Sequence, residues 1–173
     1  LRDGVPPEAA GRIDHALSLV DTGIRGIRSV VHSLRPSLLD DLGLLPALRS
    51  LITEFTQRSG LAVTLEAPGA VAALSKDAEL ALFRALQEAL SNVRKHARAG
   101  AVSVTLQGLE GGKELALSVR DDGEGFDPQR VAEQSGASVG IGIMRERAHR
   151  IGARLEVDSA PGRGACVTLM LPR

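Results

Sequence analysis

The apolar residues after position 60 change their spacing several times along the chain, and this order of spacings most constrains the fold. Five stretches alternate apolar and polar residues as β-strands do: 61–68, 101–108, 113–120, 153–159 and 165–172. Two stretches repeat apolar residues every three to four positions as helices do, namely 75–98, with Ser75 as its expected N-cap, and 141–151. This order predicts an α/β fold, a two-layer sandwich in which helices cover one face of a mixed sheet.

The first third of the chain has a different pattern. Between residues 8 and 34, seven apolar residues are separated by alternating gaps of four and three: Ile13, Leu17, Val20, Ile24, Ile27, Val31 and Leu34. This spacing is typical of a helix in a bundle or coiled coil. A shorter helix with Pro46 in its first turn is expected to end near Ser59, before Gly60. We therefore expect a helical segment at 1–59 and an α/β domain at 60–173.

Composition excludes several classes of function. The 21 basic and 21 acidic residues cancel, so the chain has no general attraction for nucleic acid or for an anionic membrane. Tryptophan and tyrosine are absent and phenylalanine occurs three times, which excludes aromatic platforms for single-stranded nucleic acid. One cysteine and no apolar run of the roughly 18 to 20 residues that span a bilayer predict a cytoplasmic region. The first twelve residues lack a start methionine and a signal peptide, which indicates a piece of a longer protein.

The helix expected at 75–98 carries a polar stripe. Glu88, Asn92 and His96 lie one turn apart, and this stripe is interleaved on the helix surface with Ala81, Ala85 and Ala89. Small residues beside an acid and an amide leave room for a ligand to approach. The alternative is an ordinary amphipathic helix whose polar residues face solvent.

Glycine-bearing loops follow. Asp121 comes directly after an expected strand and, with Gly123 and Gly125, forms D-x-G-x-G. A carboxylate beneath such a turn is an acceptor suited to the exocyclic amine of adenine. The alternatives are a plain turn or a calcium loop, and Ala132 at the position of the last calcium ligand disfavours calcium.

Two further pairs of glycines complete the pattern. Gly140 and Gly142 stand just ahead of the expected second helix, where exposed backbone amides attract anions. Gly162 and Gly164 separate the last two strands and by themselves indicate a hairpin turn.

In this order, the four motifs resemble the ATP-binding fold shared by gyrase, Hsp90, MutL and histidine kinases, known as the Bergerat fold. The stretches LRPSLLDDLGLLPALRSL, QEALSNVRKHA and GIGIMRERAHRIGARLEVDSAPGRGACVTLMLP look like the C-terminal region of two-component sensor histidine kinases of the nitrate-sensor type. The resemblance covers nearly the whole chain.

The resemblance implies roles for individual residues. Asn92 matches the ligand of Mg²⁺, and Glu88, beside the same ion, matches the residue that assists the nucleophile. Lys95 and His96 match the basic end of that motif near the phosphates, and Asp121 matches the aspartate that contacts adenine. The resemblance also assigns five glycines to the nucleotide site: Gly123, Gly125, Gly140, Gly142 and Gly164. Residues 126–140 match the mobile lid.

The family's phosphoacceptor histidine is missing. It lies on a first bundle helix and is followed by Asp or Glu, whereas His15 is followed by alanine and His32 by serine. The resemblance therefore implies a fragment that binds Mg·ATP without phosphorylating itself. In the whole protein, the γ-phosphoryl group would pass to a histidine on the missing helix and then to a response regulator. The helical segment would form a homodimer.

Three other functions share parts of these motifs. A clamp ATPase of the gyrase or MutL sort would use water as acceptor and would continue into a further domain. A non-catalytic module would use the first helix for dimerisation and would bind no nucleotide. An anti-sigma-type serine kinase would share the pocket but has no place for the first helix.

Overall fold

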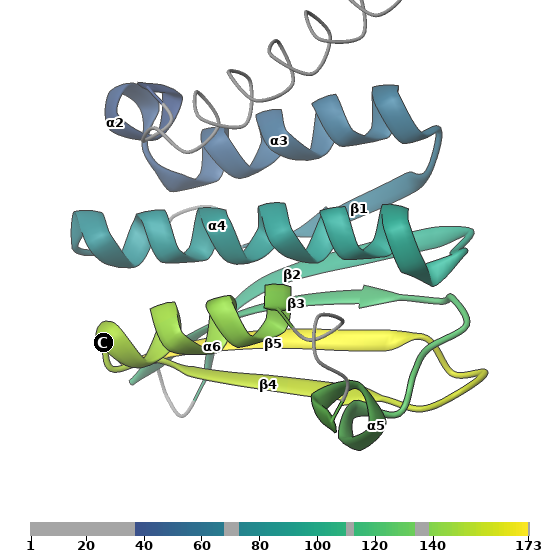
Figure 1. The fold of residues 1–173 in the computed structure, drawn as a ribbon. Coiled ribbons are helices and arrows are strands. Elements are labelled where there is room, and N and C mark those ends of the chain that lie inside the picture. Colours follow the sequence, from purple (N-terminus) through teal and green to yellow (C-terminus); the bar gives the residue numbers. More distant parts are fainter. Residues whose placement is uncertain (1–36, 68–72, 110–112, 134–138, 173) are drawn as a thin grey trace, which may run out of the picture. The chain divides into compact units, whose positions relative to one another are not determined.

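A computed structural model of the chain describes residues 37–67, 73–109, 113–133 and 139–172. The chain divides into two compact units, residues 1–37 and 38–173, and the description below concerns the second (Figure 1). The heptad helix expected between residues 8 and 34 lies outside the described residues. In the described part, no helix has both the length and the apolar character needed to cross a bilayer.

One sheet of five strands forms the base of this unit, in the order β1-β2-β3-β5-β4. The strands are β1 (Ala62–Glu66), β2 (Ala101–Leu109), β3 (Glu114–Asp121), β4 (Arg154–Ser159) and β5 (Ala165–Pro172). β1 runs parallel to β2, and every other pair is antiparallel, so the sheet is mixed as predicted. In this register Val104 stands opposite Val119 and Leu117 opposite Leu169, which brings the buried residues of neighbouring strands to one face.

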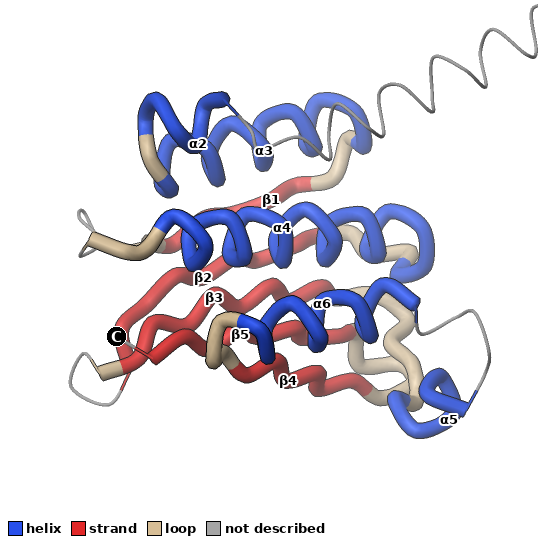
Figure 2. The backbone as a smooth tube through the Cα atoms, turned by 60° about the vertical axis from the view of Figure 1, so that its left-hand side comes forward, coloured by secondary structure: helices blue, strands red, loops and turns tan. Residues whose placement is uncertain are grey.

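Three helices lie in one layer over that face: α3 (Leu44–Ser59), α4 (Lys76–Asn92), which continues into the π-helical turn η1 (Val93–Ala97), and α6 (Val139–Arg150). Two shorter helices lie at the margins, α2 (Ser37–Leu42) beside α3 and α5 (Pro128–Glu133) near β4 (Figures 1 and 2). α4 lies between α3 and α6 and packs over β3 and β5, whereas α3 contacts β1 and α6 contacts β4 (Figures 1 and 2). On the opposite face of the sheet, Ser118 and Thr168 share a hydrogen bond of 3.1 Å. The predicted two-layer α/β sandwich is confirmed.

α4 is built as its sequence indicates, up to its last turn. Ser75 caps it by accepting a hydrogen bond of 3.2 Å from the Ala78 N–H, and Leu82, Leu86 and Leu90 are completely or almost completely buried. The helix was expected to continue to about Arg98, and its last five residues instead form the π turn η1. Arg98 then adopts a left-handed conformation at φ +50°, which ends the helix.

The fold contains two short helices that the sequence did not predict, and its core extends further toward the N-terminus than expected. α2 was not predicted, and α5 lies within the stretch 121–140 that was expected to be a loop. α3 contributes Leu44, Leu48 and Ile52 to the same core as the sheet, so α2 and α3 belong to the compact unit that begins at Leu38. The expected division at residue 60 cuts through this unit, and it stays a prediction about the roles of the two segments.

Candidate functional site

A cavity of about 320 Å³ opens at the C-terminal end of α4, within the range of about 300–1,000 Å³ usual for ligand pockets. Four parts of the chain form it: the end of α4 with η1, the facing parts of β3 and β5, the loop after β3, and the start of α6. The lining residues are Ala89, Asn92, Val93, His96, Ala97, Val119, Asp121, Gly125, Phe126, Gly140, Ile141, Ala165 and Val167. Most of them are apolar, so the few polar groups stand out.

Asp121 is the main polar group in the cavity. Only 8% of it is exposed, and among the described residues it is the one polar or charged residue that is buried. It ends β3 rather than following it, and its Oδ1 accepts a hydrogen bond of 2.9 Å from the Gly123 N–H. A carboxylate has about four acceptor positions, so Asp121 keeps acceptor capacity for a ligand that donates hydrogen bonds.

The opposite wall of the cavity comes from the end of α4. Asn92, the last residue of α4, lines the cavity, and so does His96, which is exposed and belongs to η1. Glu88 is half-buried and stands outside the lining, although it lies one turn before Asn92 in the regular α-helix. The π turn begins after both residues, at Val93, so only the His96 part of the expected α-helical stripe falls within it. Asp121 and Asn92 therefore open onto one shared cavity, although 29 positions of sequence separate them.

Ala85 and Ala89 have a role that the sequence interpretation missed. They are 7% and 3% exposed, and α6 packs against α4. Both alanines belong to the hydrophobic core, and Ala85 lies outside the cavity lining, so the space expected beside Ala85 is occupied by protein. Only Ala89 of the two borders the cavity.

Glycine is required at three positions of the loops around Asp121. A Cβ on Gly123 would overlap the carbonyl oxygen of Ala97, and one on Gly164 would overlap that of Asp121. Gly125 and Gly164 also adopt positive φ angles of +62° and +67°, where other residues are strained. The glycines therefore let the loop after β3 pack against both η1 and the last hairpin.

Ser159 links that hairpin to the loop after β3. Its hydroxyl accepts a hydrogen bond of 2.9 Å from the Phe126 N–H and donates one of 2.9 Å to the Gly164 carbonyl. Phe126 is part of the cavity wall. Ser159 therefore holds one wall residue in place without touching the cavity.

The start of α6 closes another side of the cavity. Gly140 and Gly142 were expected just ahead of this helix, and both lie within its first turn. Gly140 and Ile141 line the cavity, whereas a Cβ on Gly142 would meet open space. A Cβ on Gly140 would overlap the Glu88 carboxylate, which places Glu88 against the start of α6. Backbone N–H groups in a first helical turn are unpaired within the helix and favour anions.

The structure thus sorts the predicted site residues into two groups. Five of them line the cavity, namely Asn92, His96, Asp121, Gly125 and Gly140. Five others lie outside its lining as formed by the described residues, namely Glu88, Lys95, Gly123, Gly142 and Gly164. Lys95 is exposed, and Gly123 and Gly164 act by backbone packing.

Sequence reasoning missed the apolar walls. Val119 and Val167 are paired across β3 and β5, Phe126 lies in the loop before α5, and Ile141 lies in the first turn of α6. The alternation of β3 and β5 indicated that both valines share one face, but it did not indicate that this face ends in a cavity.

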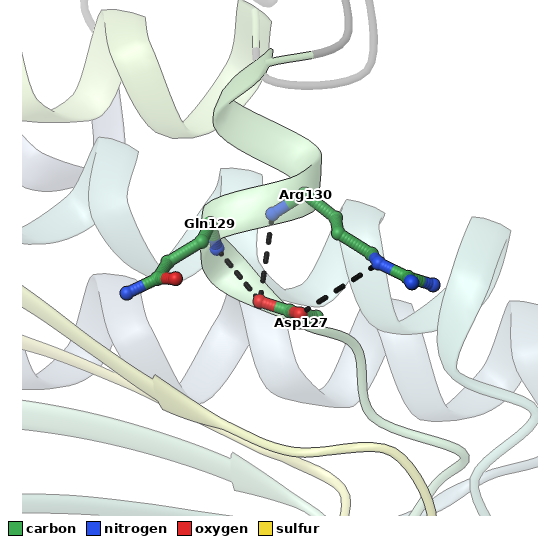
Figure 3. A network of polar contacts seen from close by, with 3 residues as sticks. All are labelled: Asp127, Gln129 and Arg130. Atoms are coloured by element: carbon green, nitrogen blue, oxygen red, sulfur yellow. Dashed lines mark hydrogen bonds and ion pairs between the residues drawn. The ribbon is translucent and has the colours of Figure 1, made fainter.

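The expected lid, residues 126–140, contains α5. Asp127 caps this short helix: its Oδ1 accepts hydrogen bonds from the N–H groups of Gln129 (2.9 Å) and Arg130 (3.4 Å), and its Oδ2 lies 4.0 Å from Arg130 Nε (Figure 3). Residues 134–138, between α5 and α6, are outside the described residues. The mobility of the lid stays a prediction.

Comparison with known proteins identifies the relatives of this chain. Residues 77–173 match the family described as histidine kinase-, DNA gyrase B-, and HSP90-like ATPase. The sensor histidine kinase MctS of Rhizobium johnstonii is 34% identical over 166 residues, which are 96% of this chain and 35% of MctS. The oxygen sensor histidine kinase NreB of Staphylococcus carnosus is 35% identical over 149 residues, 86% of this chain and 42% of NreB. The chain therefore spans less than half the length of these relatives.

Solved structures share the fold. The histidine kinase domain of the blue-light activated histidine kinase from Erythrobacter litoralis superposes with a TM-score of 0.60 at 22% identity, covering 72% of this chain and 58% of that one. Full-length ShkA in complex with AMPPNP gives a TM-score of 0.62 at 25% identity, covering 73% of this chain and 29% of ShkA.

The match to this family covers more than half of the chain, and the mixed sheet with its helical layer agrees with it. The chain belongs to the family of histidine kinase-, DNA gyrase B- and HSP90-like ATPases, and its domain is the ATPase domain of sensor histidine kinases.

Proposed function

We propose that the cavity binds ATP, with the adenine against Asp121 and the phosphates toward Asn92, His96 and the start of α6. One observation carries this proposal: Asp121 and Asn92 open onto one cavity of about 320 Å³. A buried carboxylate accepts a hydrogen bond from the exocyclic amine of adenine, and Val119 and Val167 offer apolar surface to the ring. The complex of ShkA with AMPPNP, an adenine nucleotide, supports the same choice of ligand.

Mg²⁺ is proposed to accompany the nucleotide, held by Asn92 and Glu88. Among the described residues, no three His, Cys, Asp or Glu side chains gather closely enough to enclose a metal ion. This scarcity fits Mg²⁺, which keeps several waters and binds through one or two protein ligands plus substrate phosphates. Bound Mg²⁺ would neutralise charge on the phosphates during phosphoryl transfer.

The proposed reaction is transfer of the γ-phosphoryl group to a histidine outside these 173 residues, for relay to a response regulator. In support, neither His15 nor His32 has an acidic residue after it. Glu88 is half-buried against Gly140 and is proposed to accept a hydrogen bond from the N–H of the attacking imidazole. Dimerisation through the segment 1–59 is part of the same proposal.

Titration calorimetry with ATP and Mg²⁺ tests the binding step. Asp121→Asn should weaken binding by about 10- to 100-fold, because a hydrogen bond to a charged acceptor contributes about 1.5–3 kcal/mol. Asp158→Asn makes the same chemical change at an exposed position of β4 and should leave the affinity unchanged. GTP should bind more weakly than ATP, since guanine presents a carbonyl where adenine presents the amine. If the wild type and Asp121→Asn bound ATP with equal affinity, the proposed adenine site would be refuted.

A phosphorylation assay with γ-labelled ATP tests the transfer step. The 173-residue chain should acquire no acid-labile label, whereas a longer protein that includes the upstream helix should acquire it on histidine. Steady release of inorganic phosphate by the 173-residue chain, with no transfer in the longer protein, would favour a clamp ATPase instead.

A further inference from the structure

Asp122 follows the cavity aspartate directly but serves a different part of the fold. It is exposed, and its Oδ1 accepts hydrogen bonds of 2.8 Å from the Gly100 N–H and 2.9 Å from the Ala101 N–H. Its own N–H donates to the Ala101 carbonyl at 3.4 Å. These bonds join the end of β3 to the residues that lead from η1 into β2.

The next two residues of the loop attach to the end of η1. The Glu124 N–H donates a hydrogen bond of 2.8 Å to the Ala97 carbonyl, and Gly123 packs so closely on this carbonyl that a Cβ would overlap it. The last carbonyls of a helix lack partners within the helix. The loop 122–124 therefore caps the helix that carries Asn92 and His96.

These contacts connect the two sides of the cavity. Asp121 stands at one side, Asn92 and His96 at the other, and the segment 97–101 is held between them by the loop 122–124. We infer that Asp122 is a positioning residue, which sets the separation between the base contact at Asp121 and the phosphate contacts at the end of α4. The inference rests on the proposed binding of ATP.

Two observations assign this role to the carboxylate of Asp122. Hydrogen bonds from the backbone N–H groups of Ala101 and Gly100 lower the pKa of Asp122, so the carboxylate stays ionised and its bonds are charge-assisted. The other side-chain link across this junction joins Arg98 and Glu124 at 2.8 Å, but these side chains are 81% and 58% exposed. Exposed ion pairs contribute little, so that link does not replace Asp122.

Two substitutions separate the effect of the hydrogen-bond acceptor at position 122 from the effect of its negative charge. Asp122→Ala removes the acceptor, and Asp122→Asn keeps an oxygen that can accept both backbone hydrogen bonds. Affinities for Mg·ATP and for adenosine are measured by calorimetry on both variants and the wild type. Amide hydrogen exchange at Gly100 and Ala101 reports whether the bonds are lost.

Mg·ATP would contact both sides of the cavity, whereas adenosine would contact mainly the side of Asp121. A shift of one side should therefore weaken the binding of Mg·ATP more than that of adenosine. Asp122→Ala should weaken Mg·ATP binding by about tenfold and adenosine binding by less than about threefold, since small misplacements of contacting groups are costly. Asp122→Asn should stay within about twofold of the wild type for both ligands. If the alanine variant does not fold, Asp122→Glu displaces the acceptor by one methylene, and the same change in the affinity ratio is expected.

The outcomes distinguish this inference from the proposed function. Equal losses for both ligands, or no loss for either while exchange at Gly100 accelerates, would overturn the positioning role and leave Asp122 a structural residue. A wild-type chain that binds no ATP would overturn the proposed function itself. Loss of binding in Asp121→Asn with unchanged affinities in Asp122→Ala would overturn the inference alone.

Discussion

Gly125 and Gly162 provide a matched pair that separates two reasons for requiring glycine. Both have positive φ angles, +62° and +79°, so alanine is strained at either position. A Cβ on Gly162 meets nothing within 4 Å, whereas one on Gly125 would overlap the carbonyl oxygens of Ala160 and Gly164. Alanine at Gly162 therefore changes only the backbone conformational energy, and alanine at Gly125 adds a steric conflict between the loop after β3 and the last hairpin.

The magnitudes follow from these two terms. Left-handed conformation costs a non-glycine residue about 1–2 kcal/mol, so Gly162→Ala should lower the free energy of unfolding by about that amount. Forcing extra atoms into packed surroundings typically costs a further 1–3 kcal/mol, so Gly125→Ala should lower it by about 2–5 kcal/mol. Because Gly125 lines the cavity, its substitution should also weaken ATP binding.

Urea denaturation of both variants and the wild type measures the difference, with unchanged m-values as the sign that midpoints report stability. Calorimetric titration with ATP on the folded variants measures the effect on the cavity. Equal losses of stability in the two variants would show that the overlap at Gly125 is relieved at no cost, and would refute the close packing of the two loops.

Three further outcomes concern the core, the α5 cap and pH. Leu86→Ala should lower the free energy of unfolding by about 2–5 kcal/mol in urea, because Leu86 is completely buried, whereas Leu42→Ala, at a side chain 60% exposed, should change it by less than about 0.5 kcal/mol. Asp127→Ala should cost about 1 kcal/mol of local stability in α5, seen as faster amide exchange at Gln129, with no change in the exchange of α4. The pKa of Asp122 is lowered in the folded state, so ionised Asp122 stabilises the fold at pH values above its unfolded pKa of about 3.9. This stabilisation is lost as the pH falls through the folded pKa. The urea midpoint of Asp122→Asn should therefore fall less on acidification than that of the wild type.

The kinds of secondary structure and their order were predictable from the sequence. Alternation and helical repeats are read from neighbouring residues, and they indicated all five strands and the helices α3, α4 and α6 to within a few residues. Ser75 as a cap and Gly60 as a stop follow from equally local chemistry, since a cap needs only a side-chain acceptor and a stop needs only a residue that tolerates positive φ. The family was likewise indicated by short motifs in a fixed order.

The tertiary structure decided which surfaces meet. Nothing local in Ala85 distinguishes a small residue that leaves room for a ligand from one that is packed in the core, because its burial is decided by segments remote in sequence. Glu88 lies against Gly140 at the start of α6 and stays out of the lining, whereas His96, in the π turn after Asn92, belongs to it. The loop 122–124 packs against the end of that turn. Periodicity indicates that a residue is buried, but the residues that it packs against are determined by contacts between segments remote in sequence. The chain's sequence therefore determined its elements and its motifs, and long-range packing determined the cavity they form.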